Sequence, residues 1–313
     1  MSIPRLLQVP SGRDIPTSGA FVLSVDARLS AVIAQAVTEG RRFFETSEEE
    51  KRALSVTLSE GARGWVPPRD QRVDRRYESF DFGREDPASA GLERVLFAEN
   101  QWPERKEFKE AALRAFGTME QIGLRLLGML LLKDRSALSD ELRTAKPCSS
   151  GRLLHYVSAS GTASGGVGPH TDYEALTLVW QSAPGLETWS PEQGWERPVT
   201  ELDELLVFPG DSAELLTGGR VEAVLHRVEV EAGERWSFVV FVAPDFHSEC
   251  GSFGSGDGYH NDVVIGEHIA ACICAGHEHL RQATDGARLG SLAESGDGGG
   301  NPIAARLRRE AET

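Results

Sequence analysis

The sequence predicts a mainly β protein with flanking helices, and two patterns along the chain support that prediction. From Arg152 onward, short apolar runs are separated by Gly, Pro, Asp and Ser, which is the spacing of a β-sandwich or barrel. Before that point, two stretches carry apolar residues at helical spacing. All-β cores of this size often form one unit, so we expect a single domain over residues 1–283 of the 313.

The first part of the chain, to about residue 150, is expected to be mainly helical. Residues 27–54 show helical spacing, and the segment SEEE carries a capping signal that opens a second short helix. A loop rich in Gly, Pro and Arg is expected from Gly61 to Asp86. The apolar stripe from Phe108 to Leu132 then predicts a long supporting helix.

The β core is expected over about residues 151–245. Its candidate strands are the apolar runs RLLHYV, ALTLVW, LETWS, WERPV, ELLVF and AELLT. A C-terminal helix is expected over about residues 261–283. From about Thr284 the chain is rich in Gly, Ser, Asp and Glu, which predicts a disordered tail over residues 284–313.

Composition and charge argue against several classes of protein. A net charge of −15 with no dense Lys/Arg stripe argues against nucleic-acid binding. The basic cluster at residues 69–76 is interrupted by Asp70 and Asp74, and can be read as a solvated loop or as an anion site. No run of eighteen apolar residues and no signal peptide are present, so we expect a cytoplasmic protein without a membrane span. Four cysteines without CxxC spacing argue against disulfides and a structural zinc site.

Three residues form a candidate metal site. In GPHTDYEALTLVW, His170 and Asp172 are two residues apart, so in an extended backbone both side chains point to the same side. In EAVLHRVEV, alternation places His226 on the same face as the neighbouring valines. Two histidines and one carboxylate leave about three coordination positions open, which suits non-haem iron(II), whereas zinc hydrolases more often keep one. Each motif alone is more often a surface or core feature, so the prediction depends on their combination.

A candidate site for a second ligand follows on the next strand. Residues 232 and 233 predict a short hairpin turn, which would place His226 opposite Val239 and put Arg235 and Ser237 on the same face. Arg235 would then lie about 13 Å from His226. A five-carbon 2-oxo diacid could bridge that gap, with its far carboxylate on Arg235 and Ser237 and its 2-oxo acid end on iron. The alternative is a solvated arginine on a hairpin.

Taken together, these residues resemble the iron(II)/2-oxoglutarate-dependent dioxygenases of the isopenicillin N synthase-like superfamily. The resemblance runs from about Ala20 to about Pro244, through ARGWVP, ESFDFG, NQWP, LLHYV, PHTDYEALTLVWQ, PGLETWS, LLVFPGDSAELLTGG, LHRV and ERWSFVVFVAP. It implies a double-stranded β-helix, or jelly roll, with helices outside it. It also implies Fe(II), O2 and 2-oxoglutarate as co-substrate, with ascorbate as a candidate activator. Tyr156 matches a tyrosine that bonds the co-substrate in this family.

The sequence departs from the family pattern in places. The opening strand motif of the family and its His-Gly-Ile segment are missing or altered. Val157 replaces a proline that normally follows the tyrosine, and the Gly/Ser-rich segment SASGTASGGVG separates Tyr156 from the metal motif. These changes leave the role of Tyr156 open, and the inserted segment could help to shape the site.

The resemblance implies an enzyme that hydroxylates a small organic metabolite, or desaturates or cyclises it, while 2-oxoglutarate becomes succinate and CO2. Phe241, Tyr77 and Arg76 are the candidate substrate contacts, by analogy with where such enzymes bind their substrates. Two alternatives stay open: an iron oxidase of the same superfamily that does not use 2-oxoglutarate, and a non-catalytic jelly-roll binding protein. Neither the substrate nor the oligomeric state follows from the sequence.

Overall fold

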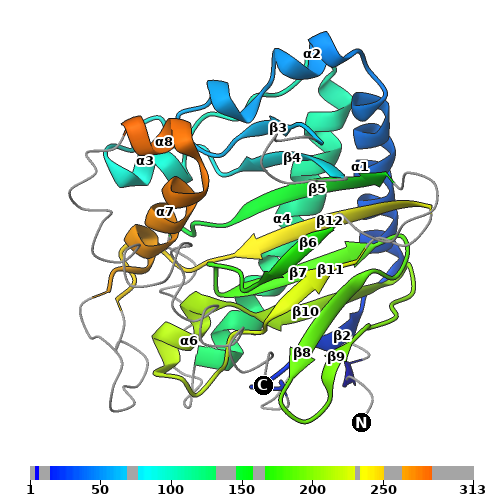
Figure 1. Cartoon of the computed structure of the whole chain (residues 1–313), viewed down its shortest axis with the longest axis vertical. Helices are drawn as coiled ribbons and strands as arrows, with labels where there is room; N and C mark the ends of the chain where they lie inside the picture. Colours follow the sequence, from blue (N-terminus) through cyan, green and yellow to red (C-terminus); the bar gives the residue numbers. More distant parts are fainter. Residues whose placement is uncertain are drawn as a thin grey trace.

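The protein is a two-sheet β sandwich with helices packed outside it (Figure 1). The computed structural model describes residues 4–6, 15–68, 77–131, 146–157, 166–229, 233–249 and 263–283. The larger sheet has the strand order β1-β2-β10-β7-β12-β5-β4-β3, and the smaller has the order β6-β11-β8-β9. The prediction of a mainly β core with flanking helices is confirmed.

The strands of the larger sheet come from both halves of the chain. They are β1 (Arg5–Leu6), β2 (Phe21–Ser24), β3 (Gly64–Val66), β4 (Tyr77–Gly83), β5 (Ser150–Val157), β7 (Leu176–Gln181), β10 (Glu204–Pro209) and β12 (Glu234–Val242). The smaller sheet contains β6 (Val167–His170), β8 (Leu186–Ser190), β9 (Gly194–Glu196) and β11 (His226–Val228).

The helices follow the capping and periodicity signals of the sequence. Helix α1 (Ala27–Phe44) begins after Asp26, whose side chain accepts a hydrogen bond from the Leu29 amide at 2.8 Å. Ser47 and Glu50 form the predicted capping box of α2 (Glu48–Arg52). The other helices are η1 (Val56–Leu58), α3 (Leu92–Leu96), α4 (Lys106–Leu131), α6 (Asp211–Thr217), α7 (Ile265–Gly276) and α8 (Glu278–Ala283). Helices α1, α2 and α4 therefore confirm the helical segments predicted within residues 27–54 and from Phe108 to residue 131.

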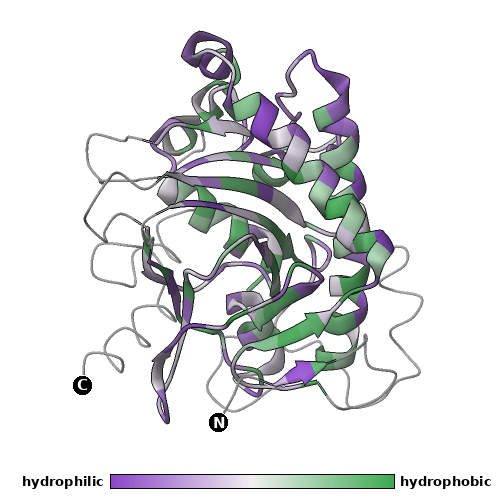
Figure 2. Cartoon of the chain, turned by 90° about the vertical axis from the view of Figure 1, so that its right-hand side faces the viewer, coloured by the Kyte–Doolittle hydropathy of each residue, from purple (hydrophilic) through white to green (hydrophobic). Residues whose placement is uncertain are grey.

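Two apolar layers stabilise the sandwich. The first lies between the larger sheet and helices α1 and α4, and includes Phe108 and Phe238, both with no exposed surface. Along its length α1 alternates between hydrophilic and hydrophobic residues, as a helix that packs on one face requires (Figure 2). The second layer lies inside the sandwich and includes Leu154, Val179 and Val239. Alternate residues of each central strand therefore contact different layers.

Two predictions about individual segments were wrong. The run AELLT was grouped with the strands, but it lies in helix α6, which Gly218 ends in the left-handed conformation. A five-residue apolar run has no period long enough to distinguish the two structures. Residues 61–86 were expected to form a loop, yet they contain β3 and β4, which pair with each other and extend the larger sheet. The predicted tail, residues 284–313, lies outside the described residues.

The predicted hairpin between residues 226 and 239 was also wrong. Strand β11 pairs with β6 and β8 in the smaller sheet, whereas β12 pairs with β5 and β7 in the larger sheet. The two strands belong to different sheets, so His226 and Val239 are not paired. Gly233 has a φ of +131°, which glycine adopts readily, and it precedes the start of β12.

In the part of the chain that the structure covers, no helix is both long and apolar enough to cross a membrane.

Candidate functional site

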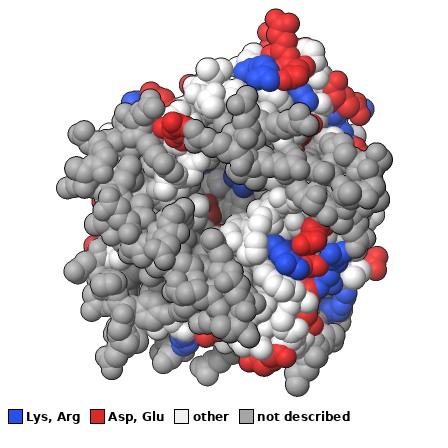
Figure 3. Space-filling view, viewed as in Figure 1, with Lys and Arg blue, Asp and Glu red and all other residues white. Residues whose placement is uncertain are grey.

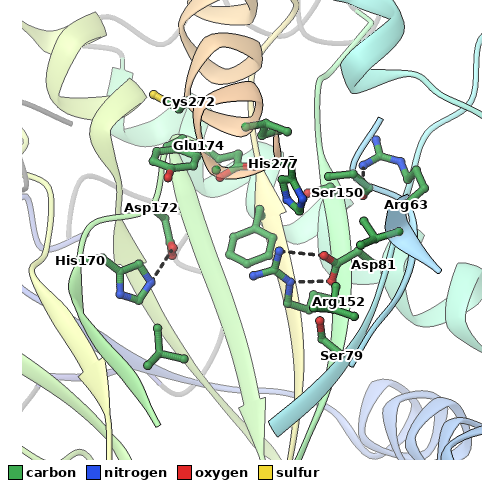
Figure 4. Close-up of a pocket in the computed structure, with 18 of the residues that line it drawn as sticks. Arg63, Ser79, Asp81, Ser150, Arg152, His170, Asp172, Glu174, Cys272 and His277 are labelled. Atoms are coloured by element: carbon green, nitrogen blue, oxygen red, sulfur yellow. Dashed lines mark hydrogen bonds and ion pairs between the residues drawn. The ribbon is translucent and has the colours of Figure 1, made fainter. Parts of the chain in front are cut away.

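The three predicted metal ligands lie together at one end of the sandwich. His170 ends β6, and His226 begins β11 directly opposite it in the register of the smaller sheet. The Nε2 atoms of His170 and His226 lie 3.6 and 3.7 Å from Oδ1 of Asp172. One ligand atom from each residue lies within 4.8 Å of the other two, so a single ion could contact all three. Figure 4 shows His170 and Asp172 pointing toward each other at the cavity wall.

Backbone carbonyls orient both imidazoles for metal binding. Nδ1 of His170 lies 2.8 Å from the carbonyl of Gly168, and Nδ1 of His226 lies 3.1 Å from the carbonyl of Val224. Since a carbonyl only accepts, each Nδ1 carries the proton, and each Nε2 is left with a free lone pair toward Asp172. This is the tautomer that a metal ligand requires.

Asp172 is fixed from both ends. The hydroxyl of Thr177 on β7 donates to its Oδ2, which leaves Oδ1 facing the two histidines. Its backbone carbonyl accepts from the amide of Asp211 at 2.8 Å, at the start of α6. The carboxylate therefore holds its position through contacts with both β7 and α6.

Burial and the neighbouring His226 lower the pKa of His170 to about 4, although Asp172 acts in the opposite direction. The imidazole is therefore neutral at physiological pH, as metal coordination requires. Two imidazoles and one carboxylate, with no fourth protein ligand among the residues that the structure covers, fit iron(II) with open positions.

A second polar site lies on the larger sheet, around Arg235 and Ser237. Arg235 is 4% exposed; its Nε donates to the carbonyl of Ala183 at 3.1 Å and its Nη2 donates to Oε1 of Gln181 at 2.8 Å. In the described part of the chain, its Nη1 and the Ser237 hydroxyl are both buried without a hydrogen-bond partner. Leaving such donors unpaired is costly, so a bound anion is the expected partner.

The spacing between the two sites suits a short diacid. Strand β7 passes both, because Thr177 bonds the metal ligand Asp172 and Gln181 bonds Arg235. Thr177 and Gln181 are four strand positions, or about 13 Å, apart. Val179 lies between them on the inner face and belongs to the apolar layer inside the sandwich. An unpaired cationic donor at one end and a metal site at the other fit 2-oxoglutarate.

Tyr156 packs against the guanidinium of Arg235, whose carbon lies 4.7 Å from the centre of the ring. Burial raises the pKa of Tyr156, so its hydroxyl stays protonated and can donate a hydrogen bond. The predicted contact between Tyr156 and the co-substrate stays a prediction.

A cavity of about 970 Å³ opens beside the metal ligands. Figure 3 shows a hollow on this face of the molecule, with basic and acidic atoms at its floor. Tyr77 and Phe241, two of the predicted substrate contacts, line the cavity, whereas Arg76 lies outside the described residues. Its walls come from β3, β4, β5, the segment 167–174 and the end of α7 with the start of α8. The β3–β4 region thus contributes strands to the wall instead of the expected loop.

Sequence reasoning missed a charged pair in this wall. Arg152 on β5 donates from Nε and Nη2 to the two carboxylate oxygens of Asp81 on β4, at 2.6 and 2.9 Å (Figure 4). Alternation could have revealed both residues, since Arg152 lies on the same face of its strand as Tyr156, and Asp81 lies on the same face as Tyr77. A third missed residue is Glu174, whose pKa burial and Asp172 raise to about 7.

Comparison with known families agrees with this site. The model of the 2OG-Fe(II) oxygenase superfamily matches residues 147–244, and that of the N-terminal region of non-haem dioxygenases in morphine synthesis matches residues 15–105. The chain belongs to the 2OG-Fe(II) oxygenase superfamily, a family of enzymes that use iron(II) and 2-oxoglutarate. The candidate metal ligands fit iron(II), and the donors around Arg235 fit 2-oxoglutarate.

Individual relatives are distant. Validamycin A dioxygenase of Streptomyces hygroscopicus subsp. limoneus is 28% identical over 230 residues, which cover 68% of this chain and 63% of that protein. A 2-oxoglutarate-dependent dioxygenase of Trichoderma harzianum is 30% identical over 63% of this chain and 66% of its own length. The match thus spans slightly less than two thirds of either relative.

Solved structures share the fold. A full-length protein of Neurospora crassa in complex with alpha-KG has a TM-score of 0.69 at 20% identity, covering 82% of this chain and 87% of that one. The dioxygenase for auxin oxidation in rice has a TM-score of 0.61 at 21% identity, again covering 82% of this chain and 87% of that one. Likeness at this identity concerns the fold, and the predicted jelly roll is confirmed.

Proposed function

We propose that the protein is an iron(II)- and 2-oxoglutarate-dependent oxygenase that oxidises a carbon–hydrogen bond of a small organic metabolite. One observation supports this above the others: the candidate metal ligands and the unpaired donors of Arg235 and Ser237 lie inside one sandwich, beside residues of β7 that are four strand positions, or about 13 Å, apart. If Arg235 were only structural and His226 only a core residue, the presence of both sites inside one sandwich would have no explanation.

The proposed roles follow from the contacts of each residue. His170, Asp172 and His226 would hold iron, with Thr177 keeping the free oxygen of Asp172 toward it. Arg235 and Ser237 would bind the distal carboxylate of 2-oxoglutarate, which fixes the orientation of the molecule before oxygen reacts. Once bound, iron and 2-oxoglutarate would activate O2, which is the oxidant: one oxygen atom would end in succinate as 2-oxoglutarate loses CO2, and the other would oxidise the substrate. The protein supplies position and shields the site from water.

The substrate is proposed to be a small specialised metabolite, which would be hydroxylated, desaturated or cyclised. The names of relatives support this class, since validamycin A dioxygenase acts by its name on a small natural product. We further propose that residues 1–283 form one catalytic domain. The support is that β3 and β4 from the first part and α7 and α8 from the last part both line the cavity beside the metal ligands.

Succinate formation tests the proposal. Protein loaded anaerobically with iron and exposed to air should convert 2-oxoglutarate to succinate slowly, even without the true substrate. His226→Ala should abolish this turnover, and Arg235→Ala should raise the 2-oxoglutarate concentration needed for it. Arg227→Ala and Glu234→Gln are matched controls on the neighbouring outward positions, where the side chains pair with Glu187 and His155.

The same measurement separates the alternatives. Tight iron binding without any succinate would contradict the proposal and favour an oxidase that does not use 2-oxoglutarate. Absence of iron binding would favour a non-catalytic binding protein.

A further inference from the structure

The charged pair Asp81–Arg152 lies in the cavity wall, and neither the proposed metal site nor the proposed 2-oxoglutarate site needs it. Both residues line the cavity, and Arg152 is far from Arg235 in the register, since it pairs with Val239 while Arg235 pairs with Tyr156. The pair therefore faces the space left for a substrate.

The Nη1 amino group of Arg152 is available to a ligand. Nε and Nη2 bond Asp81, while Nη1 forms no hydrogen bond with any residue that the structure covers. The side chain of Arg152 is 37% exposed, whereas that of Asp81 is 5% exposed. Figure 4 shows the guanidinium between Asp81 and the side of the cavity that holds His170 and Asp172. Asp81 is thus the buried anchor, and Arg152 is the part that a ligand can reach.

The position of Arg152 relative to the metal ligands suits substrate orientation. Its guanidinium carbon lies 5.3 Å from the ring centre of Phe241. Phe241 is paired with Thr177, the residue that bonds Asp172. A molecule resting on Phe241 could therefore contact Arg152 at one end and present a carbon to the metal at the other.

The electrostatics of the pair indicate what kind of group it binds. Asp81 already compensates the charge of Arg152 through two hydrogen bonds, so the unit offers a strong donor with no net charge. Apart from the candidate metal ligands and two histidines of the α7–α8 region, the remaining wall adds one arginine, Arg63, and two carboxylates, Glu174 and Glu278. Arg63 is 3% exposed; it donates to the carbonyls of Ala62 and Leu96, while its Nε is buried without a hydrogen bond among the described residues. Burial lowers the pKa of Arg63, and the nearby carboxylates of Asp81 and Glu174 act against this lowering. An anion entering this cavity would lose its hydration beside a wall on which the carboxylates Asp81, Glu174 and Glu278 outnumber the arginines Arg63 and Arg152.

We propose that this cavity binds an uncharged, polar substrate, and that a carbonyl or hydroxyl oxygen of that substrate accepts a hydrogen bond from Nη1 of Arg152. Arg152 is the specificity-determining residue, and Asp81 is a positioning residue that fixes the guanidinium and cancels its charge. This inference rests on the proposed function for the identity of the reaction, whereas the proposed contacts of Arg152 and Asp81 with a ligand do not depend on that reaction.

Two nearly isosteric probes, neutral benzamide and anionic benzoate, test the charge argument. Their dissociation constants are measured by ligand-observed NMR on protein loaded with redox-inert Zn²⁺ and saturated with 2-oxoglutarate, so that neither probe can occupy the 2-oxoglutarate site. The wild type should bind benzamide at least threefold more tightly than benzoate. Arg152→Gln should weaken benzamide binding at least fivefold, and Arg152→Lys, which keeps the charge but loses the planar fork, should give an intermediate loss.

The variant Asp81→Asn distinguishes a positioning role of Asp81 from a purely structural one, because only the former predicts a changed preference between the two probes. Removing the carboxylate leaves Arg152 with an uncompensated charge, so the preference should reverse in favour of benzoate. Arg197→Gln is the control, because Arg197 also pairs with a carboxylate, Glu187, but does not line the cavity. Circular dichroism on each variant checks that it is folded.

Benzoate binding more tightly than benzamide in the wild type, binding that is indifferent to Arg152→Gln, or no binding of either probe would each overturn the proposal. Succinate formation in the same preparations, reloaded with iron, reports separately on the oxygenase activity. Absence of succinate would refute the proposed function. The relative affinities for benzamide and benzoate would still test the proposed role of Asp81 and Arg152.

Discussion

Arg235 illustrates how single residues fix the geometry of the site. Ala183 and Gln181 hold its guanidinium, and Gly185 leaves the space that it occupies. A Cβ at Gly185 would lie 2.9 Å from Nε of Arg235 and 3.1 Å from the carbonyl oxygen of Glu229. The position of the Arg235 guanidinium therefore depends on the absence of a side chain at residue 185.

Gly185→Ala should displace the guanidinium and weaken the binding of 2-oxoglutarate about tenfold, which corresponds to the loss of about 1.4 kcal/mol. The measurement is the concentration of 2-oxoglutarate that gives half-maximal succinate formation. Gly117→Ala is the control, because a Cβ there would meet nothing within 4 Å. An unchanged response to 2-oxoglutarate would mean that Arg235 does not bind the co-substrate.

Much of the candidate site could be predicted residue by residue. Extended backbone places His170 and Asp172 on one side. Alternation places Arg235, Ser237 and Phe241 on one face of β12, whichever strands β12 pairs with. The pair Asp81–Arg152 could not be assigned as a pair, because its members are 71 residues apart and only the register of β4 and β5 brings them together.

At the scale of elements, helix α4 packs against the larger sheet through a glycine. A Cβ at Gly123 would lie 2.4 Å from Cγ2 of Val242 on β12 and 3.2 Å from Cδ1 of Leu178 on β7. This close approach allows the helix to cover the middle of the sheet. Gly117, earlier in the same helix, has open space around it.

The two glycines should therefore respond to alanine with opposite signs. Gly123→Ala should destabilise the protein by about 1 to 3 kcal/mol, because it overpacks the layer between helix and sheet. Gly117→Ala should stabilise it by about 0.5 to 1 kcal/mol, since alanine favours the helix. Urea unfolding of both variants measures this. Equal effects at the two positions would contradict the close packing at Gly123.

Strands β3, β4 and β5 are linked on the outer face by the carboxylate of Glu78. It accepts hydrogen bonds from Lys51, Trp65 and His155 at 2.9, 2.8 and 3.1 Å. Burial raises the pKa of Glu78, but the hydrogen bonds from His155, Lys51 and Trp65 outweigh it and hold the pKa below its usual value of 4.5. The ionised form is therefore stabilised by folding.

A carboxylate with a lowered pKa stabilises the fold above its unfolded pKa, and this contribution is lost as the pH falls through the folded value. Glu78→Gln should consequently cost about 1 to 2 kcal/mol at neutral pH. The difference from wild type should shrink as the pH falls below about 4.5. Chemical unfolding across about pH 3 to 7 checks this, and a difference that grew in acid would show that the sign is wrong.

The order of the elements was harder to predict than their existence. Residues 232–233 look like a hairpin turn, but the same local signal suits a chain that crosses from one sheet to the other, as β11 and β12 do. Turn chemistry describes the bend alone, whereas the pairing of β12 with β5 and β7 depends on contacts distant in sequence.

Considered as a whole molecule, the protein carries three ionisable ligands at the join of its sheets. Asp172 is bonded to Thr177 of the larger sheet, and His170 and His226 belong to the smaller sheet. An ion bound to all three residues would connect the sheets. Its binding free energy would therefore appear in the stability of the entire sandwich.

Zn²⁺ at about a hundred times its dissociation constant should stabilise the wild type by about 2.7 kcal/mol. His226→Ala should lose most of this gain, whereas Arg227→Ala should keep it, since the Arg227 side chain pairs outward with Glu187 at 2.7 Å. Thermal unfolding with and without the metal measures the difference. A gain that His226→Ala retained in full would place the ion elsewhere.

The wall formed by α7 and α8 has a consequence for how such a protein can diversify. Cys272, Ile273 and His277 face the cavity from a segment that supplies neither the candidate metal ligands nor the residues around Arg235. Exchange of this segment would change which molecules fit while the oxidising centre stayed as it is. The fold thus places the residues for the reaction and part of the substrate wall on different segments, so that specificity can change while the reaction is kept. Chimeras that replace residues 263–283 would test this separation.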